Sequence, residues 1–220
     1  MNSRMKRNLF ILITVLSLPL CYAEKNISVN PYLQLGTNIT FNTASKETSA
    51  PTPVSFMGGM GAIIKFTPLI TLEPRLDFWA MYYLYDGKDA HPAEIEHRTA
   101  SVLCFMLDVP VGFNFEIGKN TLTAGAGLGF LMRFAFLSNG VKASDSGATG
   151  SAQGDTEKIA AYFWESARFL YPEVFFAWDY KINEKLRAGL TARMYLPLGS
   201  LVSGNGVDGL ILTLSTRVIF

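Results

Sequence analysis

Charged side chains recur at alternate positions of segments that are otherwise apolar. In the clearest case, Glu73, Arg75 and Asp77 are separated by single residues that carry no charge. Because successive side chains of a β-strand point to opposite faces, these three groups would form a ladder on one face of a strand. The same pattern in other segments predicts six bases and five acids on that face: Lys65, Glu73, Arg75, Asp77, Asp108, Arg133, Glu173, Asp179, Arg187, Arg193 and Arg217.

These side chains are suited to ion pairing, because a guanidinium group can hold a carboxylate through two parallel hydrogen bonds. A charge left unpaired in a narrow interior is costly. The near balance of bases and acids favours a salt-bridged plug that closes the interior, and a gate for ions or small solutes is the alternative. We expect a charge network in the lumen with these members: Glu73, Arg75, Asp77, Asp108, Arg133, Glu173, Arg193 and Arg217. Six of them, all except Arg133 and Arg217, are expected to form one network at mid-height.

A second set of inward positions is aromatic or carries methionine, and it lies toward the longer connections. Its members are Trp79, Met81, Tyr83, Met106, Tyr171, Phe175 and Tyr195. Adaptable methionines and amphipathic aromatic rings suit a pocket for an apolar ligand. The alternative is that these side chains simply fill the mouth of the structure, as side chains commonly do in small barrels.

Both histidines of the chain, His91 and His97, lie in one polar stretch with Glu94 and Glu96. These residue types can bind a transition metal, but a metal site also needs fixed ligand geometry. A flexible connection does not supply that geometry. We therefore expect a solvated loop here, with no metal site and no cofactor.

Eight segments must position these side chains, and each alternates apolar with polar residues. They are 27–41, 54–66, 70–83, 103–115, 121–134, 170–182, 186–196 and 210–220. The connections between them alternate long and short, and the long ones are 44–53, 86–98, 138–168 and 197–206. This spacing predicts an up-and-down antiparallel sheet, with short turns at one end and long loops at the other.

The hydropathy indicates where the apolar faces lie. The chain has 49% hydrophobic residues, yet after residue 23 it has no uninterrupted apolar run long enough to form a spanning helix. Backbone polar groups in a bilayer must be satisfied internally, so a chain without spanning helices can cross only as a closed barrel. The predicted fold is therefore an all-β, eight-stranded antiparallel transmembrane β-barrel with short periplasmic turns and long extracellular loops. Leu107, Val111, Leu128 and Leu190 are expected to face lipid.

Two local features modify this plan. Prolines 31, 74, 110 and 172 lie inside predicted strands, and each removes a hydrogen-bond donor from the sheet. We expect bulges or interrupted pairing at these four positions. The second half of the longest loop, 156–168, is predicted to form one helix with Ile159, Phe163 and Ala167 on one face.

Residues 1–23 have the composition of a secretory signal peptide. Arg4, Lys6 and Arg7 precede an apolar run, and small residues end at Ala23. Lipidation at Cys21 is the less favoured alternative, because Leu20 is bulky for such a site. Cleavage after residue 23 leaves 24–220 as one barrel domain. The remainder is weakly acidic, which argues against a nucleic-acid partner, and its single cysteine cannot form an intramolecular disulfide.

The eight segments, the alternating connections and the ending Arg217-Val218-Ile219-Phe220 resemble the small eight-stranded outer-membrane barrels of the OmpW, OmpX and OmpA-barrel group. The resemblance implies outer-membrane lipid as the surroundings. It also implies that Phe220 is part of the signal that the barrel-assembly machinery reads. The OmpW-like resemblance implies a narrow route or binding site for small hydrophobic molecules. The alternative is a structural or surface-interaction protein that meets host molecules and has a plugged lumen.

Some barrels of this size are enzymes that modify lipids, and in those enzymes His acts with Ser near the outer rim. This chain has no His-x-Ser sequence, and no amphipathic helix is predicted before the first strand. We therefore expect no catalytic residues and no enzymatic activity.

Overall fold

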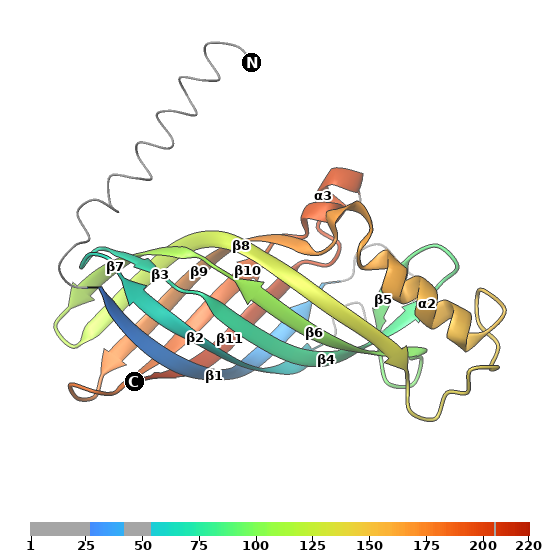
Figure 1. Cartoon of the computed structure of the whole chain (residues 1–220), viewed down its shortest axis with the longest axis horizontal. Coiled ribbons are helices and arrows are strands. Elements are labelled where there is room, and N and C mark those ends of the chain that lie inside the picture. Colours follow the sequence, from blue (N-terminus) through green and yellow to red (C-terminus); the bar gives the residue numbers. More distant parts are fainter. Residues whose placement is uncertain (1–26, 42–53, 205) are drawn as a thin grey trace, which may run out of the picture.

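The computed structural model describes residues 27–41, 54–204 and 206–220, which form a closed antiparallel β-barrel (Figure 1). The barrel closes through β1 and β11, where Leu35 is the register partner of Thr216. The strands are β1 (Ser28–Thr40), β2 (Val54–Lys65), β3 (Ile70–Leu72), β4 (Arg75–Tyr85), β5 (Ala90–Ala93), β6 (Ala100–Asp108), β7 (Val111–Ile117), β8 (Asn120–Leu137), β9 (Leu170–Lys181), β10 (Arg187–Tyr195) and β11 (Ile211–Ile219). The predicted eight-stranded fold is confirmed, because β3 with β4, and β6 with β7, each make up one of the eight ring positions.

Prolines explain why two of the eight ring positions, β3 with β4 and β6 with β7, are each divided into two strands. β3 ends before Glu73-Pro74, and β6 ends before Val109-Pro110. The two breaks face each other, since the Glu73 N–H donates to the Pro110 carbonyl at 3.0 Å. Interrupted pairing is thus confirmed at Pro74 and Pro110.

The same expectation is wrong at Pro31 and Pro172, which lie inside unbroken β1 and β9. Proline lacks a donor but keeps its carbonyl, and both carbonyls are used here. Pro31 accepts from the Phe220 N–H at 2.9 Å, and Pro172 accepts from the Leu196 N–H at 2.8 Å. A strand therefore continues through proline where the neighbouring strand needs only an acceptor.

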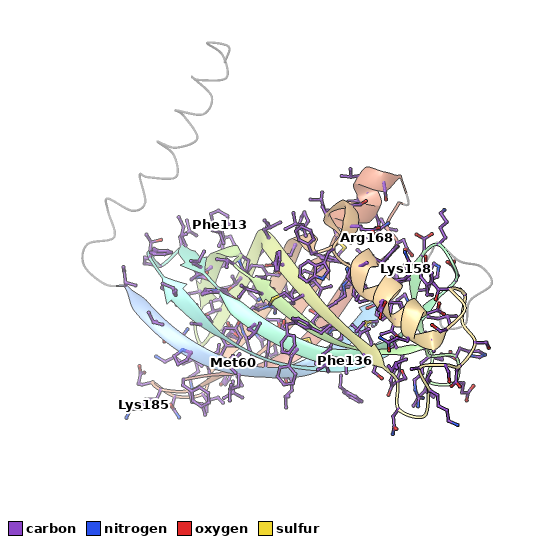
Figure 2. All side chains as sticks on the ribbon, turned by 45° about the vertical axis from the view of Figure 1, so that its right-hand side comes forward. Met60, Phe113, Phe136, Lys158, Arg168 and Lys185 are labelled. Atoms are coloured by element: carbon purple, nitrogen blue, oxygen red, sulfur yellow. The ribbon has the colours of Figure 1, made fainter. Side chains whose placement is uncertain are left out.

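The two faces of the barrel have opposite compositions. On β11, Thr213, Ser215 and Arg217 are buried, whereas Leu214 and Val218 are exposed. A soluble barrel would show the reverse, with apolar residues inside. The four positions expected to face lipid are 43–53% exposed on the outer surface, where Met60, Phe113 and Phe136 also lie (Figure 2). An apolar exterior around a polar interior is the arrangement of a transmembrane barrel.

The two ends of the barrel differ, as Figure 1 shows. The turns after β2, β7 and β9 lie at the end that carries the C-terminus. The opposite end carries β5 and the helices α2 (Ala152–Tyr162), η1 (Glu165–Ala167) and α3 (Leu198–Ser203). No helix within the described ranges is long and apolar enough to cross a membrane. The expected signal peptide and the expected loop 44–53 lie outside the described residues.

The single helix expected over 156–168 is wrong in its bounds. α2 begins earlier because the Ser151 hydroxyl caps it by accepting from the Gly154 N–H at 3.1 Å. The helix stops near Phe163, since Ser166 and Ala167 adopt left-handed backbone angles with φ of 50° and 57°. Ile159 and Phe163 are buried as predicted, whereas Ala167 is not.

Deletion of Phe220 is expected to lower the amount of assembled barrel without reducing export across the inner membrane. β11 ends at Ile219, and the Phe220 side chain is 55% exposed on the outer surface, where an assembly factor can contact it. The measurement is the amount of heat-modifiable, protease-resistant barrel in cells. Phe220→Tyr, which keeps an aromatic end, should assemble normally. Normal assembly of the deletion variant would refute this role.

Candidate functional site

The barrel interior is crossed at mid-height by buried ion pairs, which form two clusters. In the first, Arg75 pairs with Asp77 at 2.7 Å and with Asp108 at 2.8 Å. The Tyr195 hydroxyl donates a hydrogen bond to Asp108 at 2.6 Å and accepts one from the Arg75 guanidinium. The Gln34 amide donates to Asp77. All five side chains are almost fully buried, so this cluster has little contact with bulk solvent.

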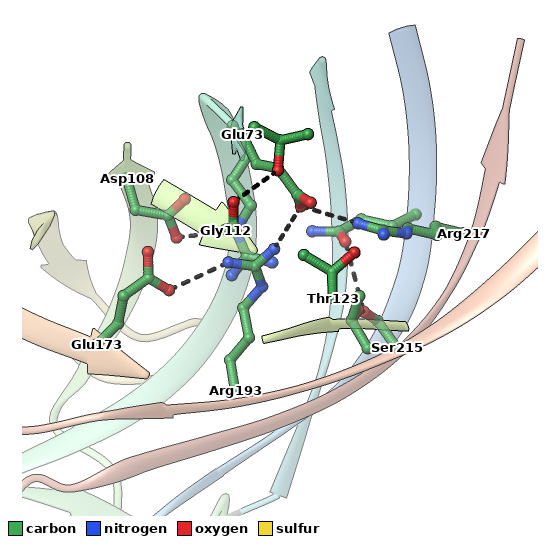
Figure 3. Close-up of polar contacts among 12 residues, drawn as sticks. Glu73, Asp108, Gly112, Thr123, Glu173, Arg193, Ser215 and Arg217 are labelled. Atoms are coloured by element: carbon green, nitrogen blue, oxygen red, sulfur yellow. Dashed lines mark hydrogen bonds and ion pairs between the residues drawn. The ribbon is translucent and has the colours of Figure 1, made fainter. Parts of the chain in front are cut away.

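The second cluster joins two arginines through Glu73 (Figure 3). Arg193 pairs with Glu173 at 3.2 Å and with Glu73 at 3.3 Å. Arg217 pairs with Glu73 at 2.9 Å and makes two hydrogen bonds to Asp179, at 2.8 and 2.6 Å. Each arginine thus bridges Glu73 to a carboxylate on β9, which ties β9, β10 and β11 to the break between β3 and β4.

Glycine makes room for these carboxylates. Gly59 and Gly189 are the inward register partners of Asp77 and Asp179. A Cβ at Gly59 would lie 1.9 Å from the Asp77 carboxylate, and one at Gly189 would lie 2.0 Å from the Asp179 carboxylate. A larger residue at either position would displace the acid from its partners. The inward glycines are therefore part of the site.

The structure differs from the expected charge network. All six residues expected at mid-height lie in the layer, together with Arg217, but they form two clusters rather than one. Arg133 lies above the layer, beside the cavity. Lys65, which was expected only to face the lumen, pairs with Glu116 at the rim, at 2.9 Å. The layer itself has three arginines for five carboxylates, because Lys65, Arg133 and Arg187 are not among its ion pairs. Neutral donors, Gln34 and Tyr195, serve the additional acids. Gln34 was missed because an uncharged residue gives no sign in sequence that it will face a carboxylate.

Above the ion pairs lies a small cavity of about 30 Å³. Four of the seven residues expected in the upper pocket line it: Trp79, Met81, Tyr83 and Tyr171. The other three do not. Tyr195 belongs to the ion-pair layer, Met106 packs in the core beneath, and Phe175 lies under Arg193, with the guanidinium carbon 4.3 Å from its ring centroid.

The cavity is covered by the segments that follow β8. Phe163 packs edge-on against Tyr83, with ring centroids 4.9 Å apart, and it also lies 4.1 Å beneath the Arg133 guanidinium carbon. Tyr162 and Arg168 line the same space, as do Pro197 and Ser200 near α3. The pocket therefore forms only when α2 and α3 pack over the barrel, and alternation within strands cannot reveal those residues.

The histidine segment is only partly the solvated loop expected from the sequence. His91 is buried in β5, and its Nε2 lies 2.8 Å from the Asp86 carboxylate. Burial acts to raise the pKa of Asp86, but hydrogen bonds from the Asp89 and Lys88 N–H groups and from His91 outweigh it and lower the pKa. The prediction is wrong for His91, because β5 pairs with β4.

His97 is exposed, and so are Glu94 and Glu96. The potential ligand atoms of these three residues lie within 4.8 Å of one another. His91 is not part of this group. The three side chains are on the surface, and exposed carboxylates often gather without binding an ion, so nothing beyond proximity indicates a metal site.

No protein-family model and no curated protein sequence matches this chain. Solved structures do match it by shape. Neisserial surface protein A matches with a TM-score of 0.52 and 9% identity, over 89% of this chain and 98% of that one. The fold is that of the small outer-membrane barrels. OprG from Pseudomonas aeruginosa matches similarly, with a TM-score of 0.51 and 9% identity over 89% of this chain and 97% of that one. At such identity the likeness concerns the fold alone.

Proposed function

We propose that this protein resides in the outer membrane, is closed to bulk ions, and binds a small molecule in its upper lumen. The barrel fold and its apolar exterior support the location. The observation that best supports this function is the arrangement along the barrel axis: a cavity lies directly above a layer of buried ion pairs. A ligand that enters from the long-loop end would be held there, because the layer below blocks passage.

The geometry of the three arginines supports the proposed closure. The side chains of Arg75, Arg193 and Arg217 are 0% exposed, and each is paired with two carboxylates. An ion moving through the lumen would have to separate these pairs, and breaking a buried pair costs about 3–5 kcal/mol. The layer therefore acts as a barrier rather than as a charged lining.

Planar-bilayer recording of the purified protein tests this closure. We expect no sustained single-channel conductance from the wild-type protein at neutral pH. An open barrel of another protein, reconstituted in the same lipid, is the positive control for insertion. Long-lived openings of the wild-type protein would contradict the closed lumen.

A surface-interaction role is the second candidate, and the ordered structure beyond the barrel favours it. β8 continues to Leu137, and α2 packs onto it and onto β4 and β5. Trp164 and Ile95 in this region are 46% and 55% exposed, and an exposed aromatic residue is a common contact point for a partner. Binding of intact cells to host surface molecules, with and without Trp164→Ala, would separate this role from ligand binding.

A further inference from the structure

The unmet hydrogen-bonding groups of the upper cavity are donors. Among the described residues that line it, four carry a buried polar side-chain atom without a hydrogen-bond partner: Thr40 Oγ1, Trp79 Nε1, Arg133 Nε and Arg168 Nε. The three nitrogens can only donate, and the hydroxyl can donate as well. Burying such groups unpaired is unfavourable, so the cavity is suited to a ligand rich in acceptors.

Arg133 is the central group, and it differs from the other buried arginines of the barrel. Arg75, Arg193 and Arg217 all pair with carboxylates, but the described contacts of Arg133 include no ion pair. Its Nη2 donates to the Arg168 carbonyl at 2.7 Å, and its guanidinium lies over the Phe163 ring. The side chain is only 7% exposed. Tyr83 also shares a side-chain hydrogen bond with Arg133. A buried cation held by a carbonyl, a phenol and an aromatic ring, with no carboxylate among its described contacts, retains attraction for an anion.

The register brings two of these donors to the same height. Cys104 on β6 is the register partner of both Trp79 on β4 and Arg133 on β8. All three side chains point inward, and the small Cys104 leaves the space between its larger neighbours open. Strands lie about 4.8 Å apart, so the Trp79 and Arg133 backbones are about 10 Å apart across that gap. Their donors can thus approach one bound group from two sides.

The charges of the residues that line the cavity also favour an anionic ligand. The described ionisable cations of the lining are Arg133 and Arg168, and Asp208 is the one described carboxylate. Tyr83, Tyr162 and Tyr171 add phenol groups and aromatic faces, and Met81 and Leu131 add apolar surface. Arg168, however, also pairs with Glu165 at 3.8 Å. The lining therefore combines one buried arginine without a carboxylate among its described contacts, Arg133, with apolar walls.

We propose that the upper cavity binds a small monocarboxylate, with the carboxylate at Arg133 and Trp79 and a short apolar body against the aromatic walls. This deepens the proposed ligand-binding function and rests on it. The volume of about 30 Å³ corresponds to about two water-sized spaces. It suits an ion of the size of acetate, while a longer chain would require α2 to move.

Titration of the protein in lipid nanodiscs with sodium acetate, followed by the NMR signals of the three tryptophan indoles, tests this assignment. We expect a saturable shift of the Trp79 N–H signal. Trp178 is an internal control, because its Nε1 already donates to Asn120 at 3.0 Å. Acetamide has the shape of acetate without the charge, and it should bind about tenfold more weakly or worse, since hydrogen bonds to charged groups are the stronger ones.

Variants separate the role of charge from that of folding. Arg133→Met should abolish the acetate shift, whereas Arg133→Lys, which keeps a cation, should retain part of it. Arg98→Met, at a partly exposed loop arginine that does not line the cavity, should bind as the wild type does. Heat-modifiable migration of each variant verifies that the barrel has folded. The wild-type comparison of acetate with acetamide does not depend on any variant.

Three results of the titration would contradict the carboxylate assignment. Equal shifts with acetate and acetamide, or with sodium chloride at the same concentration, would overturn the carboxylate assignment. A shift with acetone, a neutral probe of the same size and shape as acetate, but none with acetate would overturn it too, while leaving a ligand-binding upper lumen intact. No shift with any probe would overturn both the assignment and the proposed function.

Discussion

Arg75→Ala is expected to lower the free energy of unfolding by about 3–5 kcal/mol, because it leaves buried carboxylates without their cation. Asp77 would keep only the Gln34 amide, and Asp108 would keep only the Tyr195 hydroxyl. The same change removes a side chain from the middle of the ion-pair layer, so ion conductance should rise. Urea unfolding in lipid vesicles measures the first effect, and planar-bilayer recording measures the second.

Two further variants test the cause of this loss. Lys88→Ala removes a cation whose side chain is 88% exposed, and it should change neither stability nor conductance. Adding Asp108→Asn to Arg75→Ala removes one unpaired buried carboxylate, so the double variant should be more stable than Arg75→Ala alone. If Arg75→Ala leaves both stability and conductance unchanged, the layer is already wet and the closed lumen is wrong.

Leu128→Arg should be the next most damaging change, at about 2–4 kcal/mol if the side chain lies near the bilayer midplane. Leu128 is 53% exposed on the outer surface of β8, where a guanidinium would enter hydrocarbon without a partner. The measurement is again urea unfolding in vesicles. Leu128→Met, which keeps an apolar side chain of similar volume, should cost far less.

A substitution outside the membrane-facing surface provides the control for Leu128→Arg. Lys185→Arg, in the exposed turn after β9, should leave stability unchanged, because the turn is in water. The inward neighbour Gly127 is unsuitable for comparison, since a Cβ there would lie 2.5 Å from the Pro110 backbone and would itself disturb the sheet. Equal stability of Leu128→Arg and the wild type would mean that this face does not contact lipid.

The alternation of residue types determined much of this structure from the sequence alone. Side chains of a strand change face at every residue whatever the neighbouring strands do. The outward position of Leu190 and the inward positions of Glu73, Arg193 and Arg217 therefore follow from local pattern. Connection lengths likewise predicted which end of the barrel carries the larger loops.

The tertiary structure alone decided which inward side chains lie at the same height in the lumen. Strands in a closed barrel are tilted and staggered, so counting residues from a turn does not say which side chains meet across the interior. Tyr195, expected in the pocket, reaches Asp108 in the ion-pair layer. Arg133, expected in the charge network of the lumen, lies beside the cavity. The covering residues Phe163 and Arg168 come from a segment outside the strands, whose position depends on packing alone.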